Sequence, residues 1–573
     1  MLLYRTFLIG CVMTLGFQHT LDAQINMFWE TPENEMEYRK FTRNDSLRGG
    51  YHDLRSNNDV THYKLDLTIN PASKSLSGNV KVYFRALKII HQLQLDLYDN
   101  LKIESVRTPG RDVTLKREQH RLILNFEPRI KIGERIEVEI QYKGKPIVDE
   151  NPPMNGGFIW QDDTLGKPFV GVSCGRKGAS LWWPVKDHLY DEPDSVSMTV
   201  RIPPDLKCIS NGKLRNHYID DNNKQVYEWA HSYPINPYNV TLYVGDYVHI
   251  EDAYLSKSGN SIDLHYYVRP ENQEAASKLF NAQVKKILGI FESRFGPYPW
   301  PKDGFKLVES PYEGVEHQTA IAFGDKFNRQ SSTSFDEVLV RATAHEWWGN
   351  SVTAKDFGDI WIHEGFATYA EALVDEQIAG YESYLNFLYR KAFLITNWQP
   401  VIGPSEVKSW DSTQPDPQAK GALFLHTLRM KIGDDRLFFD ILSSFYKKHA
   451  HGHATTHDFL EMVTNKTREP YTLLFQQYLY QRKPPVLEFQ VVRGIEGEES
   501  YMLYRYSEIV DKLELPLKFK IGGTTVPINP RPEVQKVIIP DNGKIIRNST
   551  VCYVSCVPSD NLLQLFEEQG NKE

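Results

Sequence analysis

The chain has 573 residues, of which 41% are hydrophobic, 12% aromatic and 24% charged, and its net charge is -8. This composition is that of an ordinary globular protein long enough for about three domains, and it excludes a low-complexity or repeat protein. The negative charge gives no reason to expect nucleic acid as a partner.

The first residues have the organisation of a secretory signal peptide. A short basic region, Met1 to Arg5, precedes an apolar core from Thr6 to Phe17, and Leu21-Asp22-Ala23 is a suitable cleavage site. We expect a signal peptide over residues 1–23 and a leader over residues 24–50. No later run approaches the roughly 18 apolar residues of a membrane span. The mature protein is therefore expected without a transmembrane segment and exported, to the periplasm, the cell surface or the medium.

Apolar and polar residues alternate from Thr61 to about Val248, which predicts antiparallel strands. We expect a β domain over residues 51–250. The predicted inward-facing residues fall in five runs: Tyr63, Leu65, Leu67 and Ile69; Val80, Val82 and Phe84; Leu93, Leu95 and Leu97; Leu122, Leu124 and Phe126; Ile136, Val138, Ile140 and Tyr142.

Near Pro270 the hydrophobic period changes to that of a helix, and helical patterns dominate to about Gln481. These patterns predict a domain over residues 251–484. Lys483-Pro484-Pro485 then marks a break, after which short strands return and predict a C-terminal β domain over residues 485–573. The clearest helical stripe consists of Ala276, Phe280, Val284, Ile287, Phe291 and Phe295.

The stretch from Val338 to Thr353 is built like the metal-binding helix of a zinc peptidase with parts missing. In the motif H-E-x-x-H, two His four residues apart hold Zn²⁺, and the Glu after the first His activates a zinc-bound water. His345 fits the second His, which puts Arg341 at the first ligand position and Ala342 at the position of the general base. In the other register Gly349 would be the second ligand, and glycine cannot ligate.

The following helix settles the register through a family resemblance. Glu364, in WIHEGFATYAEAL, lies at the separation from His345 at which gluzincins take their third ligand. HEWWGNSV followed by this segment resembles the M1 family of zinc aminopeptidases, especially its shorter bacterial branch. Gly314-Val315-Glu316-His317-Gln318 resembles the family's exopeptidase strand, with Val315 in place of Met, and Ser180-Leu181-Trp182-Trp183-Pro184 is similar to the segment entering the cleft.

The resemblance covers roughly Thr61 to Gln481 and implies an α+β multidomain fold. It consists of an N-terminal antiparallel β saddle, a mainly helical thermolysin-like catalytic domain and a small C-terminal β sandwich. It also implies that Glu316, with Gly314 and Val315, would hold the α-amine of a peptide.

This sequence departs from the family pattern at the positions that carry out catalysis in the family. The family attacks the first peptide bond with a zinc-bound water, and a Tyr stabilises the oxyanion. That Tyr aligns with Gln418, and a Gln lining the amine pocket falls near Gly175. Of the three protein ligands only His345 and Glu364 remain, so the sequence leaves zinc binding open.

Arg341 offers a physical replacement for the metal. Its guanidinium would enter where Zn²⁺ lies in the family and could form a bidentate pair with Glu364, which would hold two helices in register without metal. Glu371, seven residues after Glu364, would either orient the ring of His345 as a hydrogen-bond acceptor or point to solvent.

Three functional readings remain. The preferred one is an exported M1 aminopeptidase-like pseudopeptidase that retains binding of peptides or protein N-termini through Glu316. The second is a working zinc aminopeptidase in which His317, His363 or solvent completes the metal site. The third is a module that binds a partner through its β domains alone.

Overall fold

The signal peptide predicted over residues 1–23, most of the predicted leader and Gly175 lie outside the residues that the structure describes. The described residues up to Arg482 form one compact unit, and the described residues from Lys483 onward belong to another. The computed structural model describes residues 42–163, 166–174, 177–324, 327, 335–407, 415–494, 499–521, 524–540, 545–547 and 553–570.

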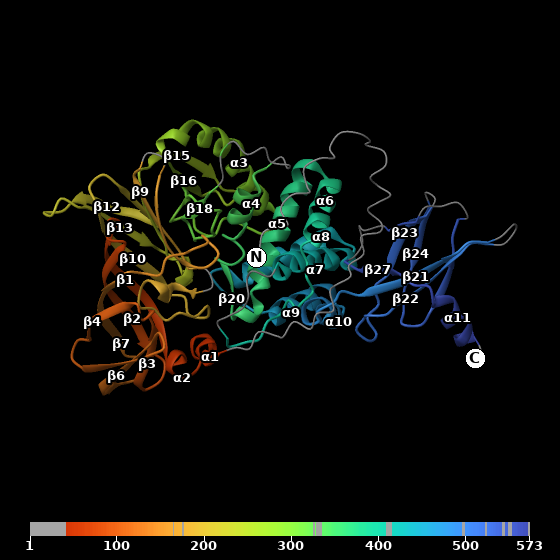
Figure 1. Ribbon diagram of the computed structural model, residues 1–573, viewed down its shortest axis with the longest axis horizontal. Coiled ribbons are helices and arrows are strands. Elements are labelled where there is room, and N and C mark those ends of the chain that lie inside the picture. Colours follow the sequence, from red (N-terminus) through yellow and green to blue (C-terminus); the bar gives the residue numbers. More distant parts are fainter. Residues whose placement is uncertain are drawn as a thin grey trace, which may run out of the picture. The chain divides into compact units, whose positions relative to one another are not determined.

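A seven-stranded sheet with the order β12-β13-β10-β1-β2-β7-β4 organises the N-terminal region (Figure 1). Neighbouring strands are antiparallel except for β1 and β10, which run parallel from the pair His62 and Ser195 to the pair Thr68 and Arg201. Residues 71–194, which include β2 to β9, separate β1 from β10, and so long a crossover permits parallel pairing. The bounds are α1 (Arg43–Gly49), α2 (Asp53–Ser56), β1 (Asn58–Asn70), β2 (Ser75–Ala86), β4 (Leu101–Arg107), β7 (Arg135–Gly144), β10 (Ser195–Ile202), β12 (Lys213–Ile219) and β13 (Gln225–His231).

Two smaller sheets complete this region. One has the order β3-β6-β5 and the other the order β11-β14-β9-β8. Their bounds are β3 (Ile90–Asp96), β5 (Asp112–Glu118), β6 (Arg121–Ile130), β8 (Gly157–Asp162), β9 (Pro168–Ser173), β11 (Lys207–Ser210) and β14 (Leu242–Gly245). The prediction of an N-terminal β saddle is confirmed, with one parallel pair inside it.

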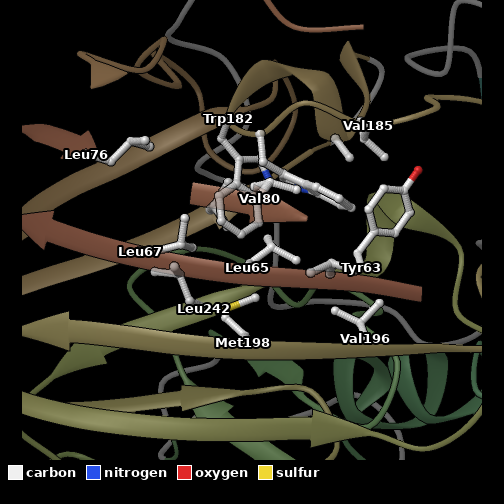
Figure 2. Close-up of a cluster of buried hydrophobic side chains, with 14 of the residues drawn as sticks. Tyr63, Leu65, Leu67, Leu76, Val80, Trp182, Val185, Val196, Met198 and Leu242 are labelled. Carbon is white, nitrogen blue, oxygen red and sulfur yellow. The ribbon is translucent and has the colours of Figure 1, made fainter. Parts of the chain in front are cut away.

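The core of the β region contains the alternating residues that the sequence predicts to face inward. All of them are buried except Ile136, which is half-buried. Figure 2 shows part of this cluster, in which side chains of β1, β2 and β10 gather around the ring of Trp182. The residues labelled there are Tyr63, Leu65, Leu67, Leu76, Val80, Trp182, Val185, Val196, Met198 and Leu242.

The next region combines a four-stranded sheet, of order β15-β16-β17-β18, with a set of helices. Helix α3 contacts β15 and helix α4 contacts β18. A two-stranded parallel pair, β19 and β20, ties the turn after α4 to the end of α8. The bounds are β15 (Val248–Leu255), β16 (Ser261–Val268), α3 (Gln273–Arg294), β17 (Phe305–Glu309), β18 (Ile321–Phe323), α4 (Glu337–Ala344), β19 (Val352–Ala354), α5 (Trp361–Ala379), α6 (Tyr381–Ala392), α7 (Asp416–Ile432), α8 (Asp435–His449), β20 (Gly452–Ala454), α9 (Thr456–Thr467) and α10 (Thr472–Phe475).

Helix α3 carries the predicted apolar stripe. Its residues Ala276, Phe280, Val284, Ile287 and Phe291 are all buried. The helix ends before Phe295, also buried, and the following glycine has a φ of +135°. The predicted period and the predicted end of this helix are both confirmed.

Helices α5 and α7 approach closely because a glycine of each faces the other. A Cβ added at Gly365 would lie 3.0 Å from the Cα of Gly421 and 3.1 Å from the carbonyl oxygen of Pro417. Backbone atoms cannot move aside as a flexible side chain can, so a larger residue at this crossing would force the two helices to shift. Since Glu364 and Gln418 lie next to this crossing, the two glycines bring these side chains together.

The C-terminal unit consists of a sheet of order β25-β22-β21-β27 and a sheet of order β24-β23-β26. A short helix that the sequence analysis did not predict, α11, packs Leu562 against Leu503 and Val534. Over the described residues, no helix combines the length and the apolar character needed to span a membrane. The bounds are β21 (Val486–Val492), β22 (Tyr501–Tyr506), β23 (Leu517–Ile521), β24 (Thr524–Ile528), β25 (Gln535–Ile538), β26 (Ile545–Arg547), β27 (Ser555–Pro558) and α11 (Leu562–Gly570).

Replacing Gly365 by alanine is expected to destabilise the protein by about 1–3 kcal/mol, because the added methyl group forces α5 and α7 apart. Urea denaturation measures this change. Gly289→Ala on α3 is the matched control, since a Cβ there would meet only the Tyr254 hydroxyl at 3.6 Å. That variant should be neutral or stabilised by up to about 1 kcal/mol. Equal effects of the two substitutions would contradict the close approach of the helices.

Candidate functional site

Helix α4 carries Arg341 and Ala342, the two positions at which the metal motif departs from H-E-x-x-H. Asp336 caps the helix, because its carboxylate accepts a hydrogen bond from the backbone N–H of Leu339 at 2.8 Å. The cap fixes where the helix begins and hence which side chains face α5.

The helix ends one residue before the motif does. It ends at Ala344, His345 is its C-cap, and the chain then turns at Gly349, where φ is +113°. A Cβ at Gly349 would lie 3.2 Å from the ring of His363 and 3.3 Å from Nδ1 of His345. Glycine at this position therefore permits both the turn and the packing of the two imidazoles against it.

The segment Gly314-Val315-Glu316 lies against α4. A Cβ added at Gly314 would lie 2.6 Å from Cγ1 of Val338 and 3.9 Å from Cβ of Ala342, so this strand and the helix are in close contact. Val315 forms a bridge with Ala322, and the side-chain amide of Asn350 donates to the carbonyl oxygen of Glu316 at 3.1 Å. The structure therefore brings the predicted amine-binding segment beside the position of the missing base.

Arg341 extends from α4 to two carboxylates of α5. Its Nη2 contacts Oε2 of Glu364, and its Nη1 lies 3.4 Å from Oε1 of Glu371 and donates to the Thr368 hydroxyl at 2.9 Å. The side chains of Arg341 and Glu364 are 25% and 22% exposed. The expected ion pair is present, but it is not bidentate: the guanidinium divides its two terminal nitrogens between two carboxylates.

The spacing on α5 explains this division. Glu364, Thr368 and Glu371 lie four and then three residues apart, so they share one face of the helix. The predicted contact of Glu371 with His345 does not form, because Glu371 instead pairs with Arg341 and lies 3.7 Å from Nζ of Lys391. Thr368 and Lys391 were not predicted as site residues, although the position of Thr368 one turn after Glu364 was a usable signal.

Gln418, at the position of the family's Tyr, also contacts Glu364. Its side chain forms a hydrogen bond with the Glu364 carboxylate, for which the amide N–H is the donor. Burial disfavours both charges of the central pair. Attraction to Glu364 and Glu371 nevertheless raises the pKa of Arg341, and Arg341 lowers the pKa of Glu364. The pair is therefore ionised at neutral pH.

The ring of His345 is buried and oriented by the backbone. Its Nδ1 lies 3.0 Å from the carbonyl oxygen of Trp348. A carbonyl oxygen can only accept, so Nδ1 carries the hydrogen and Nε2 is the nitrogen with a free lone pair in the neutral ring. His345 thus keeps the form of a metal ligand.

The two histidines that could complete a metal site are engaged in other contacts. Nε2 of His363 accepts a hydrogen bond from the backbone N–H of Ala354 at 2.7 Å, and Nδ1 of His317 lies 2.6 Å from the hydroxyl of Tyr243. Burial lowers the pKa of each ring to about 3, so both stay neutral.

The residues present do not fit the zinc ion that the motif would hold. A permanent cation, Arg341, occupies the first ligand position and contacts the carboxylate of Glu364, the third ligand. Zinc would have to displace this guanidinium and would then meet its positive charge. Only His345 retains the geometry of a ligand, and one ligand does not hold zinc.

Beside the site, the segment that resembles the cleft entry packs into the β core. Trp182 and Trp183 are each 0% exposed, so both side chains are packing residues of this core. Ten residues after Trp182, Glu192 has a side chain that is only 3% exposed and accepts a hydrogen bond from the Thr353 hydroxyl at 2.7 Å. Burial raises the pKa of Glu192 to about 8.

Comparison with protein families gives two matches. The Peptidase M1 N-terminal domain matches residues 59–238, and the Peptidase family M1 domain matches residues 281–478. The matched ranges contain every predicted site residue.

Curated relatives are similar over most of the chain at low identity. Aminopeptidase B of Mus musculus is 23% identical over 70% of this chain and 65% of its own length. Leukotriene A-4 hydrolase of Xenopus laevis is 21% identical over 73% of this chain and 70% of its own length. Aminopeptidase M1-D of Oryza sativa subsp. japonica is 27% identical over 74% of this chain, which spans 50% of that protein.

Solved structures share the fold. The M1 zinc metallopeptidase of Deinococcus radiodurans has a TM-score of 0.63 at 21% identity, over 75% of this chain and 95% of that one. A variant of it bound to a Tyr-Ser-Ala substrate has a TM-score of 0.64 at 22% identity, over 75% and 96% of the two chains. These similarities confirm the expected multidomain fold.

Replacing Arg341 by methionine is expected to lower the free energy of unfolding by about 2–3 kcal/mol. The substitution leaves Glu364 without a cation in a partly buried site, and it leaves Glu371 with Lys391 alone. Urea denaturation in the presence of EDTA measures the change without metal. Arg390→Met is the matched control, since its pair with Glu337 has side chains 49% and 44% exposed. The control should change stability by less than about 0.5 kcal/mol. Equal effects would show that the Arg341 contacts do not hold α4 to α5.

The buried Glu192 predicts a pH dependence of stability. Between its ordinary pKa of 4.5 and its folded pKa of about 8, the folded state holds a proton that the unfolded state has lost. Raising the pH through this window therefore lowers the free energy of unfolding, by up to roughly 1.4 kcal/mol per pH unit. Glu192→Gln should remove this slope in urea denaturation between pH 5 and pH 8, whereas exposed Glu313→Gln should leave it unchanged. A slope that Glu192→Gln does not alter would contradict the assignment.

Proposed function

Because the chain belongs to peptidase family M1, we propose that it is a member that binds the N-termini of peptides or proteins without hydrolysing them. The single observation that carries this proposal is the contact of Arg341 with Glu364 and Glu371. It places a permanent cation, bonded to the protein, where the family's chemistry requires an exchangeable metal ion.

The losses at the site are sufficient to abolish peptidase activity. Absence of a positioned general base at Ala342 costs about 10²–10⁴ in rate. Absence of an oxyanion donor at Gln418 costs about 10²–10³ more. These factors are not strictly additive, but each acts on a site that also lacks the metal-bound nucleophile. Gln418 is moreover engaged by Glu364 as a hydrogen-bond donor.

The charges that remain favour an ammonium group as the ligand. Glu316, Glu364 and Glu371 provide three carboxylates around the Arg341 guanidinium, and Lys391 provides a second cation beside Glu371. One negative charge is left over. Glu316 is half-buried, and among the described residues no cation forms an ion pair with it, although Arg341 attracts it from farther away. It is therefore the carboxylate that a peptide α-ammonium would meet.

The binding requires no metal in this proposal. Arg341 keeps α4 against α5, which in turn keeps Ala342 against Gly314 and the strand that carries Glu316. The methyl side chain of Ala342 leaves more room beside Gly314 than the glutamate of the family motif would. The chain's own residues therefore supply both the carboxylate that binds the peptide, Glu316, and the cation that holds its surroundings in place, Arg341.

Tripeptides of the form X-Ser-Ala with a free N-terminus are expected to bind the full chain and to be recovered intact after prolonged incubation with Zn²⁺. Isothermal titration measures binding, and mass spectrometry measures cleavage. N-acetylation of the peptide, or Glu316→Gln, should weaken binding by about 10–100-fold, because each removes one charge of an ammonium–carboxylate pair. Glu313→Gln, an exposed neighbour in the same segment, should bind as the unmodified chain does.

Two outcomes would contradict the proposal in different directions. Release of the first residue in the presence of Zn²⁺, abolished by a chelator, would establish a working aminopeptidase with an unforeseen metal site. If neither N-acetylation of the peptide nor Glu316→Gln changes the binding affinity, the result would favour a partner-binding module that uses other surfaces.

A further inference from the structure

A group of metal-binding side chains lies on the hairpin of β15 and β16, apart from the residues of the M1 motifs. His249 and Glu251 are two residues apart on β15 and therefore share one face of the sheet. His265 on β16 is the cross-strand partner of Glu251 and points to the same face. Two strands thus place two imidazoles and a carboxylate in one patch.

The distances are close to those of a coordination sphere. Nε2 of His249 and Nδ1 of His265 are 3.0 Å apart. Oε1 of Glu251 lies 3.7 Å from Nδ1 of His249, which is the other nitrogen of that ring. One ligand atom from each of the three residues lies within 4.8 Å of the others. A tetrahedral ion with bonds of about 2.0–2.1 Å separates its ligands by about 3.3 Å. The Glu251 side chain is largely exposed, so a change of its rotamer can bring the carboxylate closer to the two nitrogens.

Neighbouring groups orient the ligands. The ring of His249 is stacked on Tyr267, with ring centroids 4.3 Å apart and an interplanar angle of 2°. On its other side β16 pairs with β17, so the hairpin backbone is fixed by hydrogen bonds on both sides of His265. Such support reduces the entropy that a metal ion would have to overcome on binding.

The hydrogen bonding and charges around the patch bear on how an ion could bind. Nε2 of His249 and Nδ1 of His265 form a hydrogen bond, so one of these two nitrogens carries a hydrogen. An ion that binds both nitrogens requires this hydrogen to move to the other nitrogen of its ring. Lys306 and Lys207 repel a cation, whereas Glu251 and Asp263 attract one.

We propose that His249, Glu251 and His265 form a binding site for one divalent transition-metal ion of the zinc class. His249 has a side chain 29% exposed and Glu251 one that is 73% exposed, so water can reach the ion and complete its coordination. Two imidazoles and a carboxylate are ligands that suit Zn²⁺ better than Ca²⁺ or Mg²⁺. The site clamps β15 to β16 and does not depend on the proposed peptide binding.

Titration of the EDTA-stripped full chain with Zn²⁺ tests the site. We expect one ion per chain with a dissociation constant in the micromolar range or below, and a rise in Tm when Zn²⁺ is added. His249→Gln and His265→Gln should each weaken binding more than about tenfold. His345→Gln should bind zinc as the unmodified chain does, which separates this site from the family's metal position. Equal Tm values in EDTA establish that the variants are folded.

Cobalt provides a second readout. Co²⁺ bound by two imidazoles and a carboxylate should give visible absorption bands that His265→Gln abolishes. Zinc binding that survives both His249→Gln and His265→Gln, or that disappears in His345→Gln, would overturn the proposal, as would the absence of any binding at millimolar Zn²⁺.

Discussion

The arrangement of the candidate site depends on one partly buried guanidinium. Arg341 joins α4 to α5 through Glu364, Thr368 and Glu371, and the helices lie beside each other in Figure 1. In the family a metal ion makes the corresponding link between the two helices. Here a guanidinium links the helices. It is covalently attached to the chain and is never deprotonated, so the link forms as soon as the two helices meet.

The two glycines at the crossing of α5 and α7 extend the effect of that link. Because Gly365 and Gly421 bring the backbones into contact, Gln418 reaches the same carboxylate that Arg341 neutralises. Arg341 and Gln418 therefore interact with each other through Glu364. Substitutions at these positions are best understood as one change in a shared network of hydrogen bonds and charges.

The sequence predicted those features that depend on local periodicity. Alternation predicted the inward residues of β1, β2, β3, β6 and β7, and spacing along the motifs predicted that Arg341 would meet Glu364. It did not predict the parallel pairing of β1 with β10 or the group His249, Glu251 and His265, because both depend on which strands become neighbours. The sequence also did not predict that the two terminal nitrogens of Arg341 would contact two different carboxylates, because this depends on side-chain directions across two helices.

The parallel pairing of β1 and β10 bears on how the protein is made. Ser195 pairs with His62 although 133 positions separate them, and their side chains share a hydrogen bond of 2.8 Å. During synthesis β1 can pair early with β2, but its other edge stays open until the ribosome has released β10. Until then the free backbone N–H and C=O groups along this edge of β1 can pair with a wrong strand. We therefore expect the nascent chain to need chaperone protection over this interval.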